Sequence, residues 1–173
     1  MTLASQEVIP EEPILIEEND DPSDLVILKS AEDILRILKM AAGNPNSLNL
    51  AFDSSFITES LELLVTSLSD LSSLEALSLE CYNLDEISDD AISLFCLLIK
   101  NQTSLKSLKM DLTKCQRITN KGINQIADTL NYNLRELSLT LNHCTIGPLD
   151  QLFGAIAHLK QLKSLQKNIL KAI

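Results

Sequence analysis

A short leucine motif recurs along the chain at nearly constant spacing. It reads Leu-x-Leu or a close variant, and the steps between successive copies are 29, 31, 29 and 28 residues. The copies begin at Leu48, Leu77, Leu108, Leu137 and Leu165. A repeat of this length is one supersecondary unit that cannot bury its own apolar face, so neighbouring copies must stack side by side. The 173 residues are therefore expected to form a single repeat domain with a short tail.

Each copy contains two different apolar spacings. The first alternates with period two, as in Leu108, Met110 and Leu112, which is typical of a short strand with one buried face. An isoleucine and a hydroxyl residue follow in three copies, and hydroxyl residues cap helix N-termini. The expected caps are Thr58, Ser88 and Thr119. Apolar residues then recur three and four apart, which predicts a helix. The helical positions are Leu61, Leu64, Val65 and Leu68, then Ile92, Phe95 and Ile99, then Ile123, Ile126 and Leu130.

Segments 105–123 and 134–147 carry these features most fully. In the first, the anchors Leu105, Leu108, Met110 and Leu112 are followed by Cys115, Ile118, Thr119 and Gly122. The second is similar but has Gly147-Pro148 where the first has Thr-x-x-Gly. These residues resemble leucine-rich repeats of the ribonuclease-inhibitor-like, cysteine-containing type, over roughly residues 47–165. The resemblance implies an α/β solenoid with parallel strands on the concave side and helices on the convex side, and a non-enzymatic scaffold for protein–protein interaction.

The two ends depart from the repeat. Residues 1–23 are acidic and contain three prolines, and are expected to be disordered, although Ile14–Ile16 could add an edge strand. Residues 24–46 are expected to form an N-terminal capping unit, with a strand at 25–28 and a capping box from Ser30 to Asp33. Residues 47–173 then hold the repeats and a C-terminal cap. Residues 162–173 fit a fifth strand or a helix, and the register with earlier copies favours the strand.

The net charge of −10 is unevenly distributed. Residues 1–28 contribute −8, residues 29–99 contribute −9, and residues 100–173 contribute +7. The overall negative charge disfavours binding to nucleic acid and to anionic membranes. The basic third predicts a protein partner of acidic character, with the chain as one subunit of a larger complex. Neither a signal sequence nor a membrane-spanning stretch is recognisable, which predicts a soluble, intracellular, cytoplasmic protein.

The sequence offers little for catalysis, metal binding or cofactor binding. Aromatic residues make up 3% of it, and its four cysteines form no CxxC pair. We expect reduced, buried cysteines, with Glu86, Asp89 and Asp90 serving the start of a helix. Cys144 and His143 are adjacent, which is poor geometry for a nucleophile and its base. We therefore predict no catalytic residue, no metal and no cofactor. Two alternatives stay open: a bacterial effector that binds a host regulatory protein, and a hydrolase hidden in the concave face.

The candidate binding residues lie between the inward leucines of the predicted strands and in the loops that follow. Side chains alternate across a strand, so these positions should form polar columns on the concave face. The candidates are Ser78, Glu80, Tyr82, Lys109, Asp111, Lys114, Arg117, Ser138 and Thr140. Lys109 and Asp111 are expected in the middle of that face, where contacts with a partner are most desolvated. The competing interpretation is that these charges only keep a bare sheet face soluble.

Overall fold

Strands and helices alternate along the chain in the computed structural model, which describes residues 25–43, 45–53, 58–69, 71, 73–131 and 133–168. The strands are β1 (Leu25–Leu28), β2 (Ser47–Phe52), β3 (Ala76–Glu80), β4 (Ser107–Asp111), β5 (Glu136–Thr140) and β6 (Ser164–Asn168). The helices are α1 (Ala31–Ala42), α2 (Thr58–Leu68), α3 (Asp89–Asn101), α4 (Asn120–Thr129) and α5 (Asp150–Ala157).

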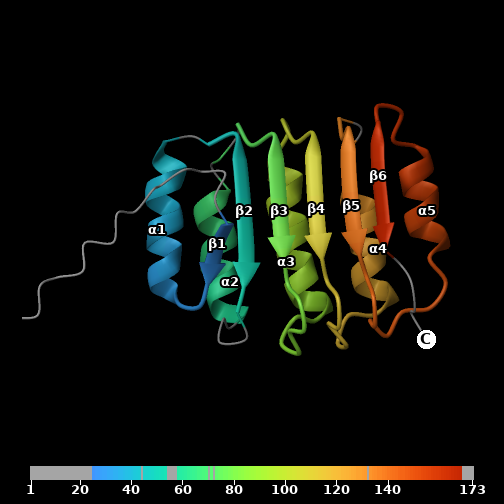
Figure 1. Ribbon diagram of the computed structural model, residues 1–173, viewed down its shortest axis with the longest axis horizontal. Coiled ribbons are helices and arrows are strands. Elements are labelled where there is room, and N and C mark those ends of the chain that lie inside the picture. The colour runs from blue at the N-terminus through green and yellow to red at the C-terminus, as the bar shows by residue number, and fades with distance from the viewer. Residues whose placement is uncertain are drawn as a thin grey trace, which may run out of the picture.

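The six strands form one parallel sheet in which spatial order follows chain order from β1 to β6. Figure 1 shows the strands side by side, with α2, α3 and α4 behind the sheet and α1 and α5 at its two ends. Parallel strands need long crossover connections, and here each connection is a helix of the preceding unit. The predicted α/β fold, with parallel strands in one layer and helices in another, is confirmed.

The core lies between the sheet and the helices, as the alternating pattern requires. The inward strand residues Leu77, Leu79, Leu108 and Met110 are at most 2% exposed. The predicted helical positions of α2, α3 and α4 are buried against them, apart from Leu130, which is partly buried. Aromatic packing is sparse, and Phe52 meets Phe95 with ring centroids 5.3 Å apart. Aliphatic side chains therefore supply most of the hydrophobic stabilisation.

The first unit, β1 and α1, begins its helix with the predicted capping box. The backbone N–H of Ser30 donates to Asp33 at 2.9 Å, and the N–H of Glu32 donates to the Ser30 hydroxyl at 3.3 Å. Burial raises the pKa of Asp33, but hydrogen bonds from the backbone of Lys29 and Ser30 outweigh it and hold the pKa below its usual value. Residues 1–23, including the edge strand considered at 14–16, lie outside the described residues.

The last described element settles the alternatives for the C-terminal segment. Residues 164–168 form β6, which pairs with β5 in the register of the earlier strands, so the strand prediction is confirmed there and the helical alternative is wrong. Leu165 is 38% exposed, whereas its counterpart Leu137 in β5 is 2% exposed. A terminal strand lacks the next unit that would complete its burial. No helix in the described part of the chain is long and apolar enough to cross a membrane.

Candidate interaction face

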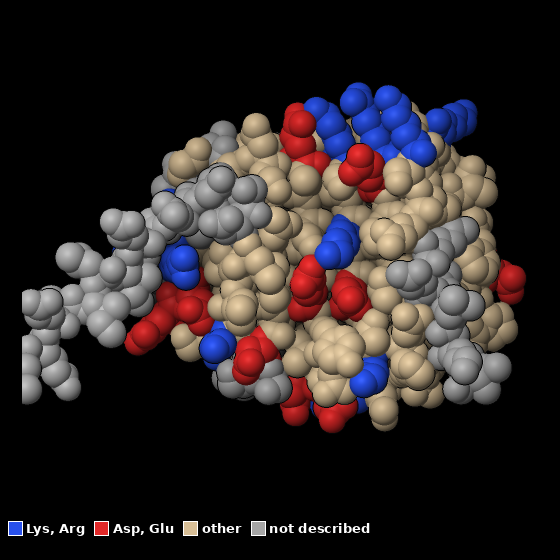
Figure 2. All heavy atoms as spheres, in the orientation of Figure 1, with Lys and Arg blue, Asp and Glu red and all other residues tan. Residues whose placement is uncertain are grey.

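The side of the sheet turned away from the helices carries two aligned rows of side chains, which we call the sheet face. Strand register places one row along Asn49, Ser78, Lys109 and Ser138, and the other along Ala51, Glu80, Asp111 and Thr140. These are the columns that the alternation predicted. Figure 2 views this side, with basic (blue) and acidic (red) side chains next to one another near its centre. Six of the nine candidate residues thus lie in the sheet face, and the other three follow the strands.

The central charges of the sheet face are already engaged within the chain. Lys109 Nζ lies 2.6 Å from a carboxylate oxygen of Glu80, and their side chains are 52% and 33% exposed. Asp111 accepts a hydrogen bond from the backbone N–H of Thr113 at 3.0 Å. Ser78 is only 8% exposed, so it offers a partner little surface. A partner that uses these charges must therefore compete with internal contacts.

The loops after β3 and β4 bring together two other candidates, Tyr82 and Lys114. Lys114 Nζ donates to the Tyr82 hydroxyl at 2.9 Å and lies 5.2 Å from the centre of its ring. Tyr82 is 56% exposed. Lys114 has φ 62°, and the equivalent residues Asn83 and His143 have φ 57° and 61°, so the three loops share one left-handed turn. This pair combines a cation with an exposed tyrosine ring, and tyrosine is a residue type enriched at binding hot spots.

Arg117, the remaining candidate, lies apart from the sheet face and belongs to a set of ion pairs that the sequence argument missed. We call the contact between the β3–α3 and β4–α4 units the β3/β4 boundary. Four ion pairs cross it: Lys106–Glu75, Lys109–Glu80, Arg117–Glu86 at 3.6 Å and Lys121–Asp90 at 3.7 Å. Three of them join equivalent repeat positions, 31 residues apart. That separation equals the repeat step, so aligning the copies by charge would have revealed them.

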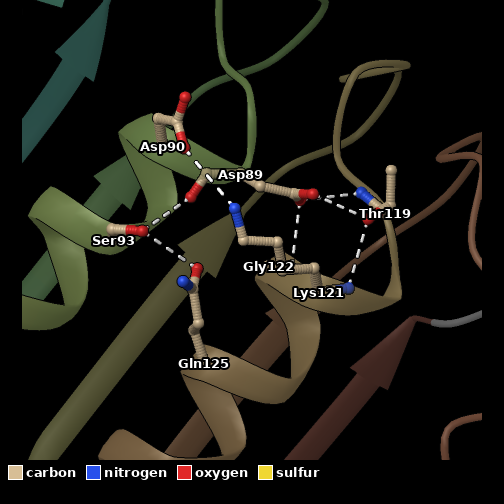
Figure 3. Close-up of polar contacts among 7 residues, drawn as sticks. All are labelled: Asp89, Asp90, Ser93, Thr119, Lys121, Gly122 and Gln125. Atoms are coloured by element: carbon tan, nitrogen blue, oxygen red, sulfur yellow. Dashed lines mark hydrogen bonds and ion pairs between the residues drawn. The ribbon is translucent and has the colours of Figure 1, made fainter.

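Asp89 has a different role from the one predicted. Figure 3 shows its carboxylate directed at the start of α4 rather than at its own helix. It accepts hydrogen bonds from the Thr119 backbone N–H at 2.9 Å, the Thr119 hydroxyl at 2.6 Å and the Gly122 N–H at 3.0 Å. The two backbone N–H groups are orphan donors of a helix N-terminus, and a carboxylate there also complements the helix dipole. Asp89 therefore links the α3 and α4 helices across the β3/β4 boundary.

The predicted hydroxyl caps meet different outcomes. Thr119 is the N-cap of α4, and its hydroxyl accepts from the Lys121 N–H at 3.1 Å, as predicted. Ser88 is the N-cap of α3 by position, but its side chain makes no capping hydrogen bond, so that prediction is wrong. Ser93 in the next turn instead donates to Gln125 of α4 at 3.1 Å. The hydroxyl pattern therefore located the helix starts but did not determine which groups satisfy them.

The cysteines are buried, as predicted, and two of them repeat the same hydrogen bond. The Cys115 thiol donates to the Cys81 carbonyl at 2.8 Å, and the Cys144 thiol donates to the Leu112 carbonyl at 3.0 Å. Burial raises the pKa of Cys115 to about 12, and burial also raises the pKa of Cys144. Both thiols are therefore protonated at neutral pH, which opposes a nucleophilic role for Cys144 beside the exposed His143.

This arrangement resembles that of solved structures, among them structures of tropomodulin and of leiomodin-1. The tropomodulin C-terminal domain from Caenorhabditis elegans is 15% identical, with a TM-score of 0.59 over 82% of this chain and 84% of that one. The structure of leiomodin-1 actin-binding site 2 is 20% identical, with a TM-score of 0.56 over 79% of this chain and 80% of that one. No family model and no curated protein matches the sequence. The likeness shows that the chain has the α/β, leucine-rich-repeat-like fold of these domains.

Proposed function

We propose that the chain is a non-enzymatic protein-interaction domain, a leucine-rich-repeat scaffold of the ribonuclease-inhibitor-like type that binds a protein partner on its sheet face. One observation carries the proposal: the helices of the described chain leave one whole side of a six-stranded sheet uncovered. Solenoid folds use such an extended surface for binding, and in this proposal it is the concave side.

The chemistry of the sheet face and of the loops that follow its strands favours a polar partner that also carries an acidic group. Tyr82 and Lys114 supply the anchor, because the ring is exposed and the cation lies over it. An acidic side chain of the partner would meet Lys114 and could displace Glu80 from Lys109 without leaving a buried charge unpaired, since both groups of that pair are partly exposed. Ser138 and Thr140 add neutral donors and acceptors on β5.

Actin is the first defined partner to test, because one structure of this fold is an actin-binding site. Co-sedimentation of the full chain with purified actin filaments, and pull-down of monomeric actin, give a direct measurement. If neither form binds, proximity labelling with the tagged full chain identifies the partner instead. A cytoskeletal or assembly partner would support the scaffold interpretation, and a host regulatory protein would support the effector interpretation.

Variants of the sheet face and of the loop after β3 test the proposal whichever partner is found. Tyr82→Ala, and Lys109→Glu combined with Asp111→Lys, are each expected to weaken binding by about 1–3 kcal/mol if these residues contact the partner. The matched control is Lys100→Glu on α3, which reverses an exposed charge on the helical side. If these variants leave partner binding unchanged and Lys100→Glu weakens it, the partner binds on the helical side. Removing residues 1–23 is expected to leave partner binding intact.

A further inference from the structure

Three cations occupy equivalent positions where β4, β5 and β6 begin. Lys106, Arg135 and Lys163 each directly precede the first residue of a strand. Their backbones are stacked, because the Arg135 N–H donates to the Lys106 carbonyl and the Lys163 N–H donates to the Arg135 carbonyl, both at 2.7 Å. With Lys160 in the preceding turn, these residues form what we call the basic rim. Figure 2 shows blue side chains gathered along this edge of the sheet, at the top of the view.

Most of the charge on the basic rim is uncompensated. Lys106 pairs with Glu75, whereas Arg135, Lys160 and Lys163 are exposed and form no ion pair within the described part of the chain. The nearest acid in sequence, Glu136, accepts a hydrogen bond from Ser107. A pocket of about 250 Å³ lies along the rim, lined by Glu75, Ser104, Lys106, Asn133, Arg135 and Gln161. Like charges held side by side on a hollowed edge favour an anionic segment as ligand.

The chain contains such a segment before its first described strand. Residues 1–28 hold eight acidic residues and no basic residue. Strands of a parallel sheet begin at the same edge, and Leu25 of β1 pairs with Asn49 near the start of β2. The chain therefore enters β1 from the edge at which the basic rim lies.

The segment is also long enough to reach the basic rim. Strands are about 4.8 Å apart, so the starts of β5 and β6 lie about 20–25 Å from that of β1. An extended chain covers about 3.3 Å per residue, so eight residues span about 26 Å. Glu17 and the acidic residues before it are within reach of Arg135 and Lys163, whereas Asp21 and Asp24 are too close to β1 to reach Lys163.

We propose that the basic rim is a binding surface for an extended acidic segment, and that its occupant is residues 7–18 of the same chain. The attraction is between exposed charges and is screened by salt. It acts because covalent linkage gives the segment an effective concentration in the millimolar range. The interaction uses the edge of the sheet and leaves the sheet face open, so this proposal is independent of the proposed function.

Carbodiimide cross-linking of the full chain, followed by mass spectrometry, tests the proposal directly because it joins carboxylates to lysine amines in contact. We expect cross-links from Glu11, Glu12 and Glu17 to Lys160 and Lys163, at least fivefold more intense than those to Lys39. Lys39 is exposed in the last turn of α1, close in the chain to the acidic segment, and so reports chance proximity. Raising the salt to about 0.5 M should remove most of the cross-links to the basic rim.

Arg135→Glu provides a clean variant, because it weakens the basic rim without removing a reactive amine. It should reduce the cross-links to Lys160 and Lys163 at least threefold, whereas Lys100→Glu, with the same change in net charge, should alter them less than twofold. Arg135→Gln, with circular dichroism to confirm folding, should give a smaller loss than Arg135→Glu. The proposal would be overturned if the cross-links to Lys39 were the more intense ones, or if Arg135→Glu left the cross-links to Lys160 and Lys163 unchanged. Cross-links between differently isotope-labelled copies would overturn it in favour of docking between two chains.

Discussion

Two neighbouring boundaries have the same strand pairing but different polar chemistry. They are the β3/β4 boundary and the β4/β5 boundary, which lies between the β4–α4 and β5–α5 units. Five residue pairs align the strands at each. The β3/β4 boundary adds four ion pairs and the Asp89 carboxylate, whereas the described β4/β5 boundary has neutral or singly charged hydrogen bonds such as Ser107–Glu136 and Gln151–Asp128. Acidic and basic parts of the chain meet at the first boundary, and the surplus positive charge remains beyond it.

The largest expected difference between the boundaries is at the first residue of the helices. Asp89 and Asn120 are equivalent, and each contacts the following unit: Asp89 through three hydrogen bonds, Asn120 through Gly147 and Pro148. Asp89→Ala should lower the free energy of unfolding by about 2 kcal/mol, and Asn120→Ala by about 1 kcal/mol, since the loss includes a charged cap. Urea denaturation measures both free energies of unfolding. Equal decreases for the two variants would show that the Asp89 and Asn120 contacts contribute equally to stability.

Removal of a buried thiol should lower the free energy of unfolding equally at the two boundaries, because Cys115 and Cys144 each make the same hydrogen bond to the preceding unit. Cys115→Ala and Cys144→Ala should each lower the free energy of unfolding by about 1.5 kcal/mol through lost packing and one hydrogen bond. Equilibrium denaturation of the two variants under reducing conditions checks this. A difference above about 1 kcal/mol would mean that packing also differs between the boundaries.

The same thiols give a pH dependence of stability. Burial raises the pKa of Cys115 from 9.0 to about 12, so the folded thiol keeps its proton to a higher pH than the unfolded thiol. Its contribution is fully present below pH 9 and is lost as the pH rises toward 12. Cys115→Ala should flatten the decline in unfolding free energy above pH 9, measured by denaturation at several pH values. Thiol alkylation at neutral pH should label Cys115 only after unfolding, and rapid labelling of the native protein would contradict the assignment.

Alanine substitutions of two helical glycines should change the free energy of unfolding in opposite directions. A Cβ on Gly122 would lie 2.5 Å from Asp89 Oδ1, whereas a Cβ on Gly154 of α5 meets nothing within 4 Å. Gly154→Ala should raise the free energy of unfolding by about 0.7 kcal/mol through helix propensity, and Gly122→Ala should lower it by about 1 kcal/mol by displacing Asp89. In the Asp89→Ala background the Gly122→Ala change should become stabilising. If Gly122→Ala still lowers the free energy of unfolding in the Asp89→Ala background, the added methyl group clashes with a group other than the Asp89 carboxylate.

The smallest effects are expected from the ion pairs themselves. Lys109→Met keeps most of the side-chain stem and removes only the charge that faces Glu80. Exposed pairs contribute little, so the loss should stay below about 0.5 kcal/mol and disappear near 1 M salt. Ser138→Ala, at the register position next to Lys109 in β5, is the control. A loss of about 2 kcal/mol for Lys109→Met would show that the β3/β4 boundary depends on its ion pairs rather than on Asp89.

Prediction from sequence succeeded where one residue's environment repeats from copy to copy. Leu77, Leu108 and Leu137 occupy the same buried position, and Ser30 with Asp33 forms a capping box within one turn. Local contacts and repeat spacing contain that information. Prediction was less complete where a side chain could bond in either of two directions, as for Asp89, which binds the next helix rather than its own.

The strand and helix pattern, the alignment of the sheet rows and the burial of the cysteines therefore follow from the sequence, because a repeated apolar period permits one way of stacking. The tertiary structure was needed for the contacts that depart from the repeat step. Stacking brought Glu80 to Lys109 and Tyr82 to Lys114, and left Arg135 and Lys163 unpaired within the described residues at the sheet edge. Charge pairing depends on the few ångströms between neighbouring units, which composition and net charge do not specify.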